Sequence, residues 1–256
     1  MRIVKKIWWL ILVIYIIIMP SFISEKVYDE LCREVKISVV DSLQYKFVTP
    51  GKIVSLIQDE NLSLLGTELK NIDAAGIEEI VAGLKEIECV EVYRTADGLL
   101  HIDADQKDPV MRVITEYGNN YYIDKHGDVI PFSNAYTPRL IVVSGNIEVP
   151  DKCILGESIT TLDDDEPVKG IYGLVVYLRN SDFWNRQVEQ IYVSSNNEIE
   201  LVPRLGDHII KFGSISGYEY KLRVLRSFYD EVLIGIGDPG YEEIDLRFKG
   251  QLICRK

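Results

Sequence analysis

The stretch Leu84–Val113, LKEIECVEVYRTADGLLHIDADQKDPVMRV, decides the fold. Two segments within it, Cys89–Arg94 and Leu99–Ala104, are rich in apolar and β-branched residues and flank the turn dipeptide Asp97-Gly98. Asp-Gly suits the positive φ angles of a tight hairpin turn, so the pattern predicts two antiparallel strands. Asp108-Pro109 then interrupts the pattern, because the residue before a proline is restricted in conformation. The stretch therefore predicts a β-hairpin that closes one domain and leads into another.

The residues before this hairpin predict one strand and two helices. Alternation of apolar and polar residues in Val35–Val40 indicates a strand. Thr49-Pro50 supplies a helix N-cap followed by proline at the first helical position. Asp73 caps a second helix, in which apolar residues recur at i, i+3, i+4 and i+7 from Ile77. The order β-α-α-β-β is thus expected over residues 35–107.

The residues after the hairpin, 108–256, predict a strand-rich domain with two helices. One helix is expected over Tyr172–Phe183, and a second carries Tyr218, Leu222, Leu225 and Tyr229 on one face. Strands are expected over residues 110–115, 121–124, 129–131, 140–144, 188–193, 198–202, 209–212, 244–248 and 251–254. The predicted fold class of the whole chain is therefore α+β.

The first residues predict a membrane anchor. Residues 7–23, IWWLILVIYIIIMPSFI, contain no charged residue, and a span needs about 17–25 apolar residues. Basic residues flank only the N-terminal side, which predicts that residues 1–6 stay in the cytoplasm and that the rest is exported. A cleaved signal peptide is the alternative, but no small-x-small cleavage site follows the apolar run. Residues 24–34 are then expected to form a linker.

Composition excludes several other classes. The chain has 256 residues, of which 47% are hydrophobic and 27% charged, and a net charge of −12. This apolar content argues against disorder, and the acidic balance argues against nucleic acid as a partner. Four separated cysteines allow three disulfide pairings, which the sequence does not distinguish, although free or buried thiols are more common in such a pattern. The four are Cys32, Cys89, Cys153 and Cys254.

No catalytic, metal or cofactor site is expected. Gly235–Gly240 matches G-x-G-x-x-G, but a dinucleotide site needs that loop to open a helix, and here it leads towards a strand. The three histidines, His101, His126 and His208, are dispersed. The acidic run Asp163–Glu166 lacks the spacing of a calcium loop and is expected to be a solvated loop.

Several motifs together resemble the bacterial cell-division family FtsQ/DivIB. Leu84–Val113 is similar to the end of that family's POTRA domain and its junction with the next domain. Tyr121–Val129, YYIDKHGDV, is similar to the hairpin after the junction. Glu198–Gly213 and Ile244–Ile253 are similar to the family's C-terminal strands.

The resemblance implies a scaffold rather than an enzyme. It implies a single-pass inner-membrane protein at the division septum, which recruits FtsB- and FtsL-like partners and through them bears on the septal peptidoglycan synthase complex. The terminal strand and the helix before it would form the docking surface. Carried over to this sequence, that surface comprises Ile244, Arg247, Phe248, Gly250, Gln251, Leu252 and Ile253.

Strand physics agrees with such a role. A strand at a sheet edge exposes backbone groups that can accept an extra strand from a partner. Phe248 would supply an aromatic anchor and Arg247 a bidentate donor. The alternatives are that Phe248 packs in the core and that Arg247 pairs with Glu243 or Asp245. At the level of function, the alternatives are another POTRA-bearing membrane protein with a chaperone-like or transport-associated role, and an anchored periplasmic enzyme.

Overall fold

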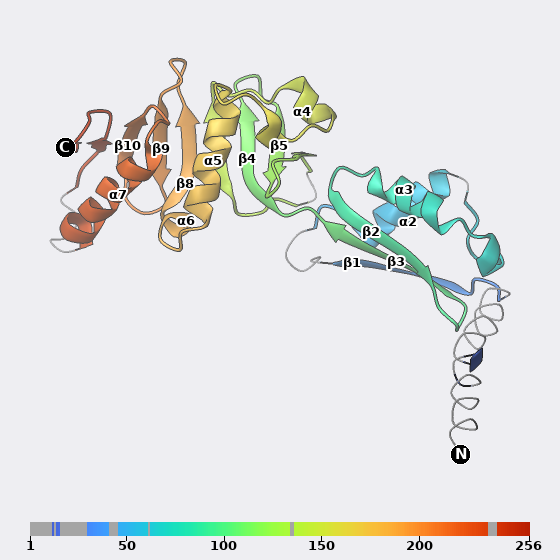
Figure 1. Ribbon diagram of the computed structural model, residues 1–256. Helices are drawn as coiled ribbons and strands as arrows, with labels where there is room; N and C mark the ends of the chain where they lie inside the picture. The colour runs from blue at the N-terminus through green and yellow to red at the C-terminus, as the bar shows by residue number, and fades with distance from the viewer. Residues whose placement is uncertain are drawn as a thin grey trace, which may run out of the picture. The chain divides into compact units, whose positions relative to one another are not determined.

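The computed structural model describes residues 12, 14–15, 30–40, 46–60, 62–133, 136–234 and 240–256. The chain divides into two compact units, residues 1–106 and 107–256, and Figure 1 labels helices and strands of both. The predicted anchor, residues 7–23, lies outside the described residues except for Leu12, Ile14 and Tyr15, which are helical. Within the described ranges, no helix combines the length and apolarity that a membrane crossing requires.

Among the described residues from 30 to 106, the first unit forms a three-stranded sheet with two α-helices. β1 pairs in parallel with β3, and β2 pairs antiparallel with β3, which gives the strand order β1-β3-β2. A short 3-10 turn, Leu69–Asn71, lies between the helices. The predicted β-α-α-β-β order is therefore confirmed. The elements are β1 (Glu34–Val40), α2 (Pro50–Asp59), α3 (Ala74–Ala82), β2 (Ile87–Arg94) and β3 (Leu99–Gln106).

Local side chains fix the ends of these elements as the sequence predicts. The Thr49 hydroxyl accepts a hydrogen bond from the Lys52 amide at 3.3 Å, and the Asp73 carboxylate accepts one from the Gly76 amide at 3.0 Å. Both contacts satisfy amides that a helix start leaves without a partner. Gly98 turns the β2–β3 hairpin with a φ of 84°.

Residues 30–34 correct the predicted linker. Cys32 is only 2% exposed, and its amide donates to the carbonyl of Thr67 at 2.8 Å. Leu31 forms an isolated β-bridge with Glu68. This segment therefore packs on the first unit, because a bridge to the segment after α2 satisfies its backbone, and it is not a free linker.

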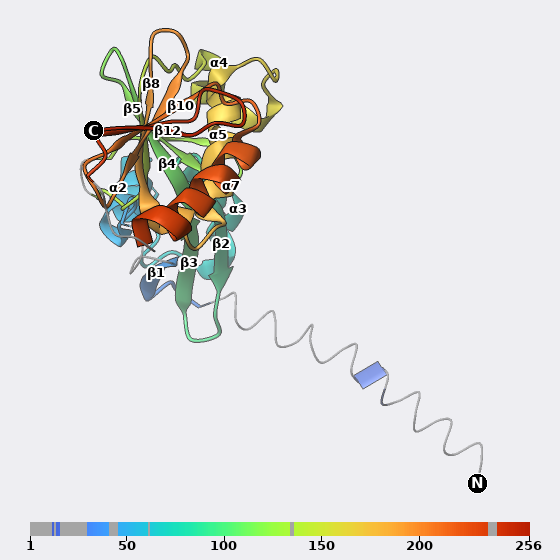
Figure 2. The ribbon, with the colours of Figure 1, turned by 90° about the vertical axis from the view of Figure 1, so that its left-hand side faces the viewer.

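The second unit contains a nine-stranded sheet in the order β12-β11-β10-β9-β8-β7-β4-β5-β6. Helices α5 (Pro167–Arg179) and α7 (Tyr218–Phe228) cover one face, as both views show (Figures 1 and 2). Their buried leucines join the core beneath them. The strands are β4 (Pro109–Thr115), β5 (Asn120–Asp124), β6 (Val129–Pro131), β7 (Ile141–Gly145), β8 (Val188–Val193), β9 (Ile199–Pro203), β10 (Ile209–Gly213), β11 (Glu243–Asp245) and β12 (Ile253–Arg255).

The structure changes several predicted bounds in this unit. α5 begins at Pro167 and ends at Arg179, because proline at the first helical position starts the helix earlier than the apolar pattern alone indicated. Two short helices, α4 (Asp151–Leu155) and α6 (Trp184–Gln187), add to the two predicted ones and are too short for a periodic signal. A π-helical turn, Tyr229–Ile234, extends α7. The last two strands are shorter than predicted, at three residues each.

Candidate functional site

The end of the large sheet is formed by the last strand of the chain. β12 pairs antiparallel with β11, with Glu243, Ile244 and Asp245 opposite Arg255, Cys254 and Ile253. β11 in turn runs parallel to β10. On its other side β12 has no strand partner among the described residues. Its outward N–H and C=O groups are therefore an open ladder to which another strand can bind.

The loop between β11 and β12 gives this edge its shape. Gly250 adopts a φ of 74°, which a residue with a side chain rarely adopts. The Gln251 amide donates to the Phe248 carbonyl at 3.2 Å and tightens the same turn. The loop thereby reverses the chain and returns it along β11.

Side chains along the edge divide into buried and exposed sets. Ile244 is 0% exposed, and Leu252 and Cys254 pack partly against the same core. Phe248 is 50% exposed and Ile253 is 36% exposed. The prediction that Ile244 contacts a partner therefore needs correction: its side chain holds β11 on the core from within. The alternative that Phe248 packs in the core is wrong, because its side chain is exposed.

Arg247 forms a clamp on a buried carboxylate. Its Nε and one terminal nitrogen donate to the two carboxylate oxygens of Asp245 at 3.0 and 2.8 Å, and Asp245 is fully buried. The Arg247 amide donates to the same carboxylate at 3.0 Å. These hydrogen bonds lower the pKa of Asp245 and raise the pKa of Arg247. Glu198 lies 3.6 Å from the other terminal nitrogen.

The guanidinium of Arg247 is thus already paired within the protein, as one of the sequence alternatives proposed. Its aliphatic stem crosses Gly213, where a Cβ atom would lie 2.7 Å from Arg247 Cγ. A second ion pair, between Arg255 and Glu243 at 2.6 Å, links β12 to β11. The Arg255–Glu243 pair joins the two strands in their observed register, whereas the Arg247–Asp245 pair is local to the end of β11.

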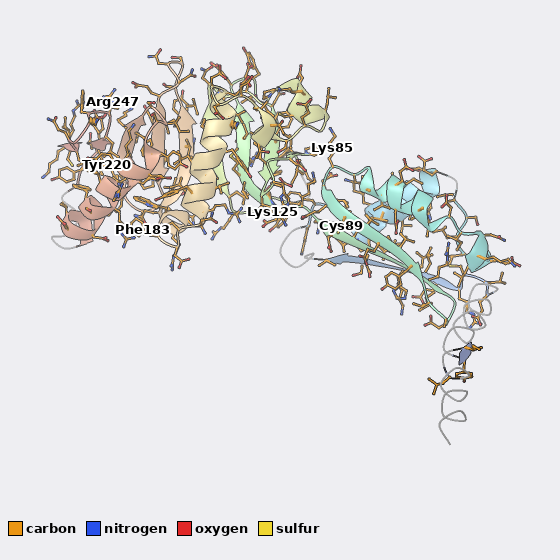
Figure 3. All side chains as sticks on the ribbon, viewed as in Figure 1. Lys85, Cys89, Lys125, Phe183, Tyr220 and Arg247 are labelled. Atoms are coloured by element: carbon orange, nitrogen blue, oxygen red, sulfur yellow. The ribbon has the colours of Figure 1, made fainter. Side chains whose placement is uncertain are left out.

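A cavity of about 420 Å³ opens beside this edge, between α7 and the β11–β12 loop. Four predicted docking residues line it: Arg247, Phe248, Gly250 and Gln251. The opposite wall comes from α7 and the residues before it, including Tyr220, Lys221 and Val224. Arg247 and Tyr220 are labelled at the same end of the second unit in Figure 3.

Sequence reasoning did not name these α7 residues individually. Tyr220 is 48% exposed. Lys221 donates to the carbonyls of Phe212 and Ser214 at 2.9 and 2.7 Å, and burial lowers its pKa. The only signal in the sequence was that Tyr220 falls off the apolar face defined by Leu222 and Leu225.

Comparison with protein-family models assigns both units of the chain to families. The family model described as FtsQ/DivIB, C-terminal related, matches residues 108–255, which is more than half of the chain. The chain belongs to this FtsQ/DivIB-related family. A POTRA-like domain matches residues 30–105. Comparison with curated proteins gave no significant match.

The family assignment confirms the resemblance inferred from sequence motifs. The chain is a division-associated POTRA protein, and the FtsQ/DivIB family is membrane-associated at the division site. FtsQ/DivIB and POTRA-like domains are non-enzymatic scaffold domains. The nine-stranded sheet is the FtsQ/DivIB-related domain, and its β12 edge is the strongest candidate site.

The remaining histidines, cysteines and glycine-rich motif singled out in the sequence form no metal site among the described residues. His208 is buried and shares a 2.7 Å hydrogen bond with the Tyr229 hydroxyl. All four cysteines are free thiols, and two of them, Cys32 and Cys153, are buried. Across the described ranges, no group of three or more histidine, cysteine or acidic side chains could hold a metal. The glycine-rich motif at 235–240 lies outside the described residues except for Gly240.

Proposed function

We propose that this chain is a single-pass membrane scaffold of the bacterial division machinery, which recruits FtsB- and FtsL-like proteins to the septum. Recruitment would occur by strand addition along β12, and through these partners the chain would bear on the septal peptidoglycan synthase complex. The observation that supports this proposal is the open side of β12, beside an exposed Phe248 and a cavity shared with α7.

The free energy of the hydrogen bonds that an added strand can form along β12 is too small to hold a partner by itself. β12 has three residues, and only part of their backbone groups point away from β11. Each added hydrogen bond contributes about 0.5–1.5 kcal/mol net, whereas association costs about 4–15 kcal/mol in lost freedom. The partner must therefore also bury side chains against this edge.

The edge supplies such contacts in two places. The exposed ring of Phe248 and the side chain of Ile253 offer apolar area next to the open ladder. The cavity between α7 and the loop can receive a partner side chain or a short helix that continues from the added strand. A partner that combines an extended segment with an apolar group for this cavity fits the surface best.

Truncation of Phe248 tests the anchor. Phe248→Ala should weaken capture of FtsB-like partners by full-length protein about thirtyfold, which corresponds to about 2 kcal/mol for the loss of a true anchor. Leu155→Ala is the matched control, because Leu155 is 81% exposed and lies on α4. Equal binding by both variants, with unchanged circular dichroism, would contradict the proposed site.

Deletion of residues 253–256 tests the strand itself. This deletion removes β12 and keeps Ile244 and Leu246, which are 0% and 4% exposed and belong to the core. We expect loss of partner capture with the remaining sheet intact. Capture that persists after this deletion would show that the partner binds elsewhere.

A second candidate function rests on the first unit. A groove of about 570 Å³ lies between β1 and α2, lined mostly by apolar atoms, and β1 is also an edge strand. An extended apolar peptide could add to β1 there, as a chaperone-like or transport-associated POTRA protein would require. Val54, which is 41% exposed in this groove, gives the discriminating variant. If this function holds, Val54→Asp abolishes peptide capture and spares capture of FtsB-like partners.

A further inference from the structure

A cavity lined by arginines stands out in this acidic chain. It has a volume of about 210 Å³ and lies where β7 begins and where α5 and β9 end. Four arginines line it, and none of its lining residues is acidic: Arg139, Arg179, Arg186 and Arg204. They come from four separate segments, since Arg139 precedes β7, Arg179 ends α5, Arg186 lies in α6 and Arg204 follows β9. The fold, and not one basic run of sequence, brings them together.

These four cations have no carboxylate within ion-pairing distance among the described residues. Four other described arginines, Arg33, Arg226, Arg247 and Arg255, each pair with a carboxylate. Four like charges around one cavity repel one another, and an anion in the cavity would offset that repulsion.

Two of the four side chains are held in place by backbone carbonyls. A terminal nitrogen of Arg179 donates to the Pro109 carbonyl at 2.6 Å, and Arg186 Nε donates to the Asp182 carbonyl at 2.9 Å. A guanidinium carries five N–H donors, so each keeps further donors for a ligand. Arg139 and Arg204 are exposed and make no side-chain hydrogen bond to the described residues, so both can turn towards a ligand. Asn185 adds an amide to the same wall.

We propose that this cavity binds a phosphate-bearing anion. A phosphate group presents several oxygens in different directions, which suits planar guanidinium forks that approach from separate segments. A carboxylate has only two oxygens in one plane and could engage fewer of them. One water occupies about 30 Å³ in the liquid, so the cavity has room for an anion of several heavy atoms.

The proposed site is independent of the β12 edge. β7 and β9 lie inside the sheet, and no residue that lines this cavity lines the cavity beside α7. Loss of anion binding would therefore leave the docking proposal unaffected, and the reverse also holds.

Titration of the full chain with inorganic pyrophosphate tests the proposal. The protein is kept in micelles of an uncharged detergent and followed by calorimetry, with acetate at equal ionic strength as the comparison anion. Arg139→Gln/Arg204→Gln removes two exposed cavity arginines. Arg33→Gln/Arg223→Gln removes the same charge outside the cavity and is the matched control. Thermal unfolding midpoints verify that both variants fold.

We expect pyrophosphate to bind the wild type and the control equally, and to bind much more tightly than acetate. The cavity variant should lose about tenfold in affinity for each arginine removed, as expected for hydrogen bonds between charged groups. Equal affinity in the cavity and control variants, or acetate binding as tight as pyrophosphate binding, would overturn the proposal.

The source of the phosphate is resolved by lipid nanodiscs. If lipid headgroups occupy the cavity, phosphatidylglycerol discs should weaken pyrophosphate binding to the wild type relative to phosphatidylcholine discs, and the cavity variant should lose this difference. If the ligand is a free phosphate compound, the difference in pyrophosphate affinity between the two kinds of disc should be the same for the wild type and for the cavity variant. Either result supports the shared phosphate chemistry and assigns its source.

Discussion

Replacing Arg247 with methionine removes the cation that faces the buried carboxylate of Asp245 and keeps an apolar stem over Gly213. Two charge-assisted hydrogen bonds are lost, and each contributes about 1.5–3 kcal/mol. The Arg247 side chain is 35% exposed, so water offsets part of the loss. We therefore expect the free energy of unfolding of the second unit to fall by about 2–3 kcal/mol at pH 7.

The pH dependence of this loss follows from the lowered pKa of Asp245. A carboxyl whose folded-state pKa lies below its unfolded value contributes stability above the unfolded value, about 3.9. That contribution disappears as the pH falls through the folded-state pKa. The difference between wild type and Arg247→Met should therefore narrow as the pH falls below about 4, because protonation of Asp245 removes the charge that needs a partner.

Urea unfolding of the full chain in micelles measures this effect. Trp184 is 5% exposed in the core of the second unit, and it becomes the sole tryptophan reporter when Trp8 and Trp9 are replaced by phenylalanine. With a slope of about 1–3 kcal/mol per molar urea, the midpoint should fall by about 1 M. Arg223→Met, an exposed arginine on α7, is the control and should leave the midpoint unchanged.

The cycle with Asp245→Asn isolates the pair itself. The double variant should be more stable than the sum of the single losses indicates, because neither charge is then left alone. If Arg247→Met leaves the urea midpoint unchanged and nevertheless abolishes partner capture, the clamp interpretation is wrong and Arg247 is a partner contact.

Three further predictions test other parts of the chain. Gly145→Ala should destabilise the second unit by more than about 3 kcal/mol, since its added Cβ would lie 2.2 Å from the Val193 carbonyl at a φ of +100°; urea unfolding measures this, and a neutral result contradicts the observed β7–β8 contact. A reporter active only in the cytoplasm should work at the N-terminus and fail at the C-terminus if residues 7–23 form the predicted anchor, and the reverse pattern rejects that topology. Triple alanine substitution of Asp163–Asp165 should leave division intact, because Asp164 is 97% exposed and forms a surface ion pair with Lys169; failure of division would reveal a site in this loop.

Local patterns were sufficient for much of the fold. Thr49-Pro50 and Asp73 set the starts of α2 and α3 as predicted, because a helix cap acts within a few residues. Asp97-Gly98 likewise predicted the β2–β3 hairpin, because a turn also depends on residues a few positions apart. The short helices α4 and α6 were missed, since one turn of helix carries no periodic signal.

The candidate site was only half predictable. The terminal strands and Phe248 followed from sequence patterns and family resemblance, whereas the burial of Ile244 depends on its position over the core between β10 and β12. Strand alternation tells which residues share a face, but not which face meets the core.

The sequence alone determined the β-α-α-β-β order of the first unit, its helix caps and hairpin turn, and the resemblance to the family to which the chain belongs. Only the tertiary structure decided that β12 ends the sheet, that Arg247 is clamped to Asp245, and that four arginines from distant segments line one cavity. The physical reason is range: caps and turns act between residues a few positions apart, whereas strand order and the meeting of distant charges depend on how the whole sheet packs.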